Sequence, residues 1–170
     1  MKRMNVVTLL VAMTLLTSAK LTLAADATDY TGKYAERPKK AANRSTESTL
    51  EVIQNENAIE ITLIQSGKRT TSQCPFNGSE GDYTSPGGIL GKCKAQLKEK
   101  NLIIESVVVA HPQPTTNVRL HTKERWRLSK DGKTLAIKSD VDFPDFPSGV
   151  SAAVSGDTST TVEYTRIANP

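Results

Sequence analysis

The sequence lacks the groupings of residues on which most catalytic sites are built. Its two histidines, His111 and His121, have no cysteine or serine nucleophile close to them in the chain. The segment around Ser151 loosely matches the nucleophile elbow of hydrolases. That motif needs a strand before it and a helix after it, whereas Ser151 lies in a loop of Gly, Ser and Ala. We therefore expect that the protein is not an enzyme and carries no cofactor.

Long apolar runs are absent except over residues 6–16, and this run is shorter than the roughly 20 residues that cross a bilayer. It follows a basic start and leads into small residues near Ala24, which is the pattern of a secretory signal peptide. We predict a signal peptide over 1–24 and a single β-barrel domain over 25–170. The protein would then be exported, and either periplasmic or secreted. An uncleaved membrane anchor is the alternative.

Aromatic residues are scarce, at 5% of the chain. Outer-membrane barrels carry aromatic girdles and outward apolar bands, so this composition argues against one. Together with the lack of a second apolar run, it predicts that the protein is not an integral membrane protein once the leader is removed.

A large excess of charge of one sign is also missing from the expected mature chain. The whole sequence has a net charge of +4, but residues 1–24 contain three of its 22 basic residues and none of its 18 acidic ones. The remaining 19 basic and 18 acidic residues nearly balance. Nucleic-acid binding needs a basic surface to neutralise phosphates, so we expect no nucleic-acid partner.

The two cysteines, Cys74 and Cys93, are too few for a zinc site, which takes four ligands at short spacings. They are also too far apart for a redox pair of the Cys-x-x-Cys kind. An even number of cysteines in an exported chain predicts a disulfide. It would close a loop rich in Gly, Ser and Pro and stabilise the fold by about 3 kcal/mol. No metal site is expected.

Helical periodicity is absent, and the chain is instead typical of β-structure. Apolar and polar residues alternate over 59–63 and 92–98, the period of a half-buried strand. His111 and Pro112 are expected to end a strand that begins at residue 102. The predicted strands and hairpins cover residues 31–36, 49–54, 58–65, 68–73, 92–98, 102–110, 118–143 and 160–167. The fold class is therefore all-β: an antiparallel meander of about eight strands, which avoids exposed edges by closing into a barrel.

The hairpin over residues 118–143 turns at an Asp-Gly pair. If Trp126 and Ile137 face each other on the buried side, this one pair fixes the partner of every other residue in the two strands. Leu128 then pairs with Leu135. On the opposite face, Lys123 falls opposite Asp140 and His121 opposite Asp142.

Five basic residues occupy alternate positions of one strand in this hairpin, so they share one face. We call them the cationic stripe: Arg119, His121, Lys123, Arg125 and Arg127. If the apolar face points inward, the stripe is a solvated outer wall, available to an acidic partner. If the stripe points inward, it would line an anion-binding cavity. Burying several unpaired cations is costly, which favours the outer wall.

Three aromatic residues are candidates for binding a ligand or for forming the rim of the barrel. Trp126 lies on the apolar face of the hairpin, whereas Phe143 and Phe146 lie in the proline-containing segment Phe143-Pro144-Asp145-Phe146-Pro147 at the end of its second strand. As ordinary core, these side chains would fill the barrel. As a lid or rim, they would contact an apolar ligand.

The segments Thr31-Gly32-Lys33-Tyr34, Asn77-Gly78-Ser79-Glu80 and 126–135 resemble a group of small exported bacterial proteins, mostly of unassigned function, with lipocalin-like β-barrels. In lipocalins a Gly-x-Trp motif lies on the first strand, and an Arg on the last strand stacks on that Trp. The resemblance implies that Gly32, Tyr34 and Arg166 close the barrel in the same way, with Tyr in place of Trp.

Two functions remain open. The first is a lipocalin-like protein that holds a small apolar or amphipathic ligand in its barrel, since barrels of about eight strands can be just wide enough for one. The alternative is an envelope module with a filled barrel that binds another protein through the cationic stripe. An empty interior would favour the first, because fold alone does not decide function.

Overall fold

The structure is a computed structural model that describes residues 28–37, 48–113, 116–144 and 159–168. The expected signal peptide over 1–24 lies outside these residues. The described chain contains ten β-strands and no helix. They are β1 (Gly32–Glu36), β2 (Ser48–Gln54), β3 (Ala58–Gln65), β4 (Lys68–Pro75), β5 (Gly81–Thr84), β6 (Leu90–Lys98), β7 (Asn101–Gln113), β8 (Thr116–Leu128), β9 (Thr134–Asp142) and β10 (Thr160–Ala168).

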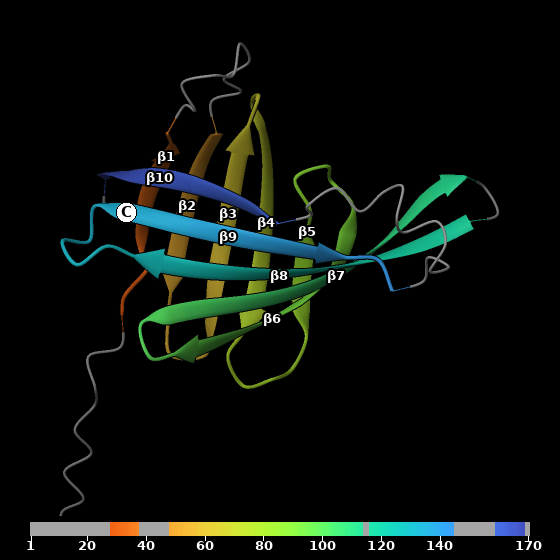
Figure 1. Ribbon diagram of the computed structural model, residues 1–170, viewed down its shortest axis with the longest axis horizontal. Coiled ribbons are helices and arrows are strands. Elements are labelled where there is room, and N and C mark those ends of the chain that lie inside the picture. The colour runs from red at the N-terminus through yellow and green to blue at the C-terminus, as the bar shows by residue number, and fades with distance from the viewer. Residues whose placement is uncertain (1–27, 38–47, 114–115, 145–158, 169–170) are drawn as a thin grey trace, which may run out of the picture.

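These strands form one antiparallel sheet in the order β4-β3-β2-β1-β10-β9-β8-β7-β6-β5. Strands that follow one another in the chain are neighbours in the sheet, apart from β4 and β5. The first strand also pairs with the last, which curls the sheet round into a nearly closed barrel (Figure 1). The predicted all-β meander is therefore confirmed. The far ends of β7 and β8 project beyond the barrel.

The two edges of the sheet, β4 and β5, meet without a backbone ladder, and we call this place the seam. The backbone N–H of Thr84 donates to Ser72 Oγ at 2.9 Å across it. A Cβ on Gly81 would lie 1.9 Å from the carbonyl oxygen of Gln73, so only glycine allows the strands to come this close. A disulfide between Cys74 on β4 and Cys93 on β6 joins the two sides of the seam, with 5.2 Å between the Cα atoms.

The described chain has one strand more than the predicted ranges, which comprise seven single strands and one two-stranded hairpin, and the end of one expected strand also differs. The short strand β5 lies within the segment rich in Gly, Ser and Pro that we expected to be a loop. Its four residues pair with β6 through backbone groups, which composition does not reveal.

The expected break at His111 and Pro112 is also absent, since β7 continues to Gln113. The register of the β7–β8 ladder shifts between Ala110 and Gln113. Proline has no N–H to donate and is tolerated in strands at such irregularities.

The predicted register of the β8–β9 hairpin is confirmed. Trp126 pairs with Ile137 and Leu128 with Leu135, while Lys123 faces Asp140 and His121 faces Asp142. Alternate residues of each strand therefore point inward, as the pleat requires. The inward set forms the core, whose largest fully buried side chains are Trp126, Tyr30, Tyr34, Ile59, Leu102, Ile104 and Leu135.

Candidate functional site

One end of the barrel is closed by the residues around the β1–β10 ladder, and we call it the closed end. Tyr34 pairs directly with Arg166 in that ladder. The Arg166 guanidinium carbon lies 5.2 Å from the centre of the Tyr34 ring, and its Nη2 donates to the Tyr34 hydroxyl at 2.6 Å. A Cβ on Gly32 would lie 3.1 Å from Arg166 Nε, so Gly32 leaves room for this side chain. The contact implied by the lipocalin resemblance is present.

Tyr30, just before β1, completes the closed end. Its hydroxyl donates to the carbonyl oxygens of Lys100, at 2.9 Å, and Trp126, at 3.1 Å. Its own carbonyl accepts a hydrogen bond from the Tyr34 hydroxyl at 2.8 Å. Burial raises the pKa of Tyr30 to about 12. This end is therefore densely packed and its hydroxyl groups are paired.

Beyond Trp126 the barrel interior is not filled. A cavity of about 130 Å³ lies there, lined by side chains from eight strands. Its wall is mostly apolar, with a few hydroxyl groups and one carboxyl group. The lining residues are Leu50, Ile61, Leu63, Thr70, Ser72, Tyr83, Thr84, Pro86, Ile104, Glu124, Trp126, Ile137, Ser139, Val162 and Tyr164.

Glu124 is the charged residue in this lining. Its Oε2 accepts a hydrogen bond from the indole N–H of Trp126 at 2.8 Å. Burial raises the pKa of the Glu124 carboxyl group, and this effect outweighs the lowering by the Trp126 hydrogen bond. Sequence reasoning missed Glu124 as a site residue. The available signal was its position two residues before Trp126, which puts both on the same face of β8.

Two tyrosine hydroxyl groups lie within electrostatic reach of this carboxylate. Burial raises the pKa of both Tyr83, on β5, and Tyr164, on β10, and the charge of Glu124 raises each further. The charge of Glu36 acts on Tyr164 in the same direction. The cavity thus has a polar side that is negative when Glu124 is ionised.

The three aromatic candidates fall in different places. Trp126 is 1% exposed and separates the cavity from the closed end, so it is an inner wall rather than a rim. Phe143 follows β9, is partly buried and is not among the residues that line the cavity. Phe146 lies outside the described residues.

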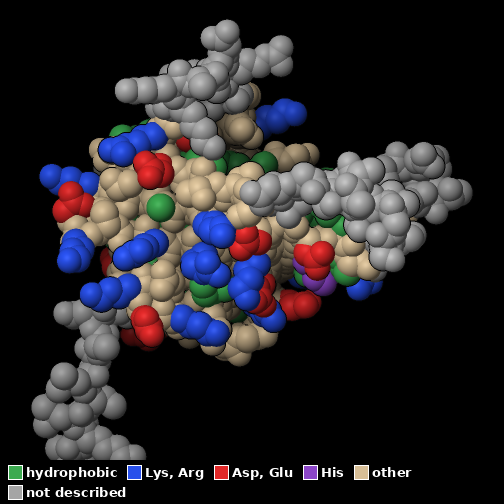
Figure 2. Space-filling view, viewed as in Figure 1, with side chains coloured by type: hydrophobic (Ala, Val, Ile, Leu, Met, Phe, Trp, Pro, Cys, Tyr) green, Lys and Arg blue, Asp and Glu red, His purple; other side chains and the backbone are tan. Residues whose placement is uncertain are grey.

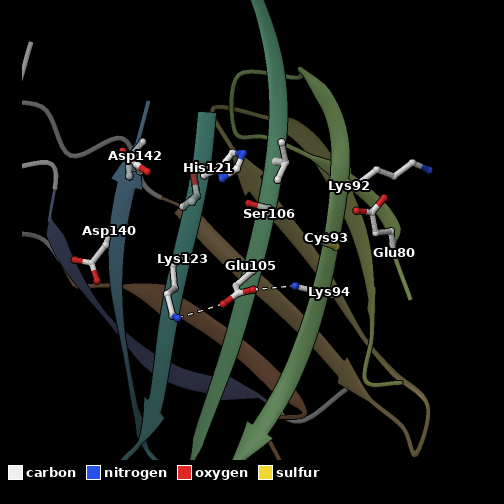
Figure 3. A pocket seen from close by; sticks show the side chains of 13 residues that line it. Glu80, Lys92, Cys93, Lys94, Glu105, Ser106, His121, Lys123, Asp140 and Asp142 are labelled. Atoms are coloured by element: carbon white, nitrogen blue, oxygen red, sulfur yellow. Dashed lines mark ion pairs between the residues drawn. The ribbon is translucent and has the colours of Figure 1, made fainter. Parts of the chain in front are cut away.

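All five residues of the cationic stripe are exposed on the outer wall. The Lys123 ammonium lies 3.2 Å from a carboxylate oxygen of Glu105, which also contacts Lys94 at 3.1 Å (Figure 3). The acidic partner of Lys123 therefore comes from β7, whereas its register neighbour Asp140 pairs with Lys138 at 3.8 Å. Acidic and basic groups are interspersed over this face (Figure 2).

A larger hollow, of about 520 Å³, lies along β6 to β9 and includes Lys94, Glu105 and Lys123 in its lining. Most of its charged side chains are exposed on the outer wall, and these three are paired with one another (Figure 3). We regard the inner cavity as the candidate site, because it lies inside the barrel and its single carboxylate is set among mostly apolar side chains. No described helix is long and apolar enough to cross a membrane.

Comparison with known proteins gives likeness in fold alone. No family model matches the chain, and no curated protein matches its sequence. Among solved structures, the REP1-NXSQ fatty acid transporter is 12% identical, with a TM-score of 0.54 over 81% of this chain and 95% of its own. A secretory abundant heat soluble protein from Ramazzottius varieornatus is 14% identical, with a TM-score of 0.53 over 81% and 95%.

The zebrafish ileal bile acid-binding protein, solved with cholic acid, is 16% identical, with a TM-score of 0.51 over 81% of this chain and 98% of its own. At these identities the likeness concerns the fold and not the ligand. The finer resemblance to small exported bacterial proteins stays a prediction. The chain has a calycin-type barrel, the fold shared by lipocalins and fatty-acid-binding proteins.

Proposed function

We propose that this protein binds a small amphipathic molecule inside its barrel and does so without catalysing a reaction. The observation that carries the proposal is the cavity itself, which combines mostly apolar walls with one partly buried carboxyl group. Small-molecule sites typically pair a mostly apolar lining with a few polar groups that fix orientation. Two structures of similar fold bear the names of a fatty acid transporter and a bile acid-binding protein, which supports the same class of function.

The volume of the cavity limits the size of the ligand. It measures about 130 Å³. An engineered protein cavity of about 150 Å³ accommodates benzene, whereas sites for drug-sized ligands occupy about 300–1,000 Å³. The buried part of the ligand is therefore about the size of one aromatic ring or a short alkyl chain. A steroid or a long fatty acid would require the lining side chains to move.

Native mass spectrometry of the protein purified from its own host tests the proposal. We expect an additional mass that leaves the protein on activation and is lost in a variant with a filled cavity. Val162→Phe fills the cavity from β10, because Val162 lines it. Ile167→Phe is the matched control, since Ile167 lies on the same strand and is 56% exposed.

The intrinsic fluorescence of Trp126, the single tryptophan, provides a second readout. Titration with benzyl alcohol should change its emission in the wild type and in Ile167→Phe, but not in Val162→Phe. If the wild type carries no additional mass and does not respond to benzyl alcohol, the barrel is filled and the proposal is wrong.

We also propose that the protein acts outside the cytoplasm. The signal-peptide pattern over residues 1–24 and the Cys74–Cys93 disulfide support this location. The protein from cell fractions should then begin near residue 25 and contain no free thiol. A cytoplasmic protein with an intact leader and two free thiols would contradict it.

A further inference from the structure

The polar residues that line the cavity indicate which charge the head group of the ligand carries. Among the described residues that line it, none is Lys, Arg or His. The interior guanidinium, that of Arg166, lies at the closed end and is bound to Tyr34. An anionic head group would therefore enter a space whose charged residue is another anion, Glu124, with no lining cation to compensate.

The Glu124 carboxylate has room for a further partner. Its Oε2 accepts from the Trp126 indole, and within the described chain no second donor reaches the group. A buried carboxylate that keeps its charge normally requires pairing, because the free energy of burying an unpaired charge is high. Glu124 is partly buried and lines the cavity among mostly apolar side chains. This arrangement would be satisfied by a ligand group that brings both hydrogen-bond donors and a positive charge.

We infer that the barrel takes a small amphipathic cation, whose ammonium head donates to Glu124 and whose apolar body lies between Leu50 and Ile137. The inference rests on the proposed function, which it narrows from amphipathic molecules in general to amines. The hydroxyl groups of Tyr83 and Tyr164 can accept further N–H donors from such a head. A fatty acid anion of the same size would meet the like charge of ionised Glu124 and should bind more weakly.

Three probes with the same ring test this selectivity: benzylamine, benzyl alcohol and benzoate. Their binding is followed by Trp126 fluorescence and by isothermal titration calorimetry. We expect benzylamine to bind the wild type at least about tenfold more tightly than benzyl alcohol, since hydrogen bonds between charged groups are stronger than those of a neutral hydroxyl. Benzoate should be the weakest of the three.

Glu124→Gln removes the charge but leaves an amide oxygen that can accept from the Trp126 indole. In this variant benzylamine should lose about tenfold in affinity, whereas benzyl alcohol should lose clearly less, because the amide oxygen can still accept from a hydroxyl group. Glu105→Gln is the matched control, because it removes an acid from the outer wall of the neighbouring strand β7. It should leave all three affinities unchanged.

The dependence on pH provides a test that needs no variant. The titratable groups that face Glu124 are Tyr83 on β5 and Tyr164 on β10, with Glu36 on β1 acting on Tyr164. Both tyrosines have pKa values raised above 10 and stay neutral below that pH. Benzylamine affinity should therefore rise with pH as Glu124 loses its proton, whereas benzyl alcohol affinity should stay flat.

The outcomes separate the two proposals. If benzyl alcohol or benzoate binds as tightly as benzylamine, or if benzylamine binding neither depends on pH nor weakens in Glu124→Gln, the cation inference is wrong while ligand binding stands. If no probe binds the wild type at any pH, both proposals fail. Tight, pH-dependent benzylamine binding that Glu124→Gln weakens supports both.

Discussion

The closed end and the cavity lie on either side of Trp126 and differ in how the oxygen atoms of their polar side chains are hydrogen-bonded. At the closed end, the hydroxyls of Tyr30 and Tyr34 donate to backbone carbonyls and Arg166 Nη2 donates to Tyr34, while the buried Arg166 Nε has no hydrogen-bond partner among the described residues. In the cavity, the carboxylate of Glu124 has a single donor and adjoins empty space. The first arrangement stabilises the fold, whereas the second costs stability and leaves a group available for binding. This contrast separates the structural part of the barrel from its candidate functional part.

The largest effect is expected from removing the aromatic ring of the closed end. Tyr34→Ala should lower the free energy of unfolding by about 3–5 kcal/mol, the usual cost of deleting a buried aromatic side chain. Tyr34 is fully buried, and its loss would also leave Arg166 without its hydroxyl partner. Urea denaturation followed by circular dichroism measures the change. Tyr83→Ala, in the cavity wall, should cost clearly less, and an equal cost would remove the contrast between the two regions.

The seam comes next. Replacing both Cys74 and Cys93 with Ala should destabilise the protein by about 3 kcal/mol, because the disulfide no longer restricts the unfolded chain. The two cysteines are 19 positions apart, so the cross-linked loop is of moderate length. The urea midpoint of the double variant should match that of the reduced wild type. A midpoint equal to that of the oxidised wild type would show that the disulfide contributes nothing.

A smaller change of opposite sign is expected at the cavity. Burial raises the pKa of Glu124, so the folded state binds this proton more tightly than the unfolded chain does. The stability from this residue is therefore present below its unfolded pKa of about 4.3 and is lost as pH rises through the raised value. Glu124→Gln should stabilise the protein at pH 7 by about 1 kcal/mol or more.

Melting temperatures of the wild type and of Glu124→Gln at several pH values measure this effect. The two curves should converge in acid and separate as pH rises. Equal stability at every pH would mean that Glu124 is fully paired in the folded protein and that its carboxylate is not available to a ligand.

The smallest effect is expected on the outer wall. Lys123→Ala removes an ion pair between side chains that are about half exposed, and such pairs contribute about 0.2–1 kcal/mol. The loss should shrink further in 1 M salt, which screens exposed charges. If the loss of unfolding free energy exceeds that range, or does not depend on salt, the cationic stripe is not a solvated outer wall.

Much of the fold was predictable from local pattern. The alternation around Trp126 gave the face and register of the β8–β9 hairpin, because the pleat leaves no freedom once one pair is known. The pairing of Tyr34 with Arg166 came from a resemblance rather than from the pattern. The strand β5 was missed because its four residues are held by backbone pairing and by the close approach of Gly81, and side-chain periodicity reports neither.

The site was less predictable than the fold. Glu124 is two residues before Trp126 in the same strand, so the sequence shows that the two side chains share a face. No local pattern shows whether a carboxyl group on that face lies next to a cation, a hydrogen-bond donor or a cavity. That depends on Tyr83 and Tyr164, which reach the same space from strands far away in the sequence. The partner of Lys123 was missed for a similar reason, since Glu105 belongs to β7 and not to the hairpin considered.

The pairing of β1 with β10 has a consequence for the order of folding. In the described sheet every other ladder joins strands that follow one another in the chain, whereas Tyr34 and Arg166 are 132 positions apart. Loop-closure entropy delays contacts between distant residues, so we expect the hairpins to form first and the β1–β10 ladder to form last. Until then both strands are open edges that can pair with another copy of the chain. Refolding should therefore lose yield to aggregation as protein concentration rises, even though the finished barrel protects both of these edges.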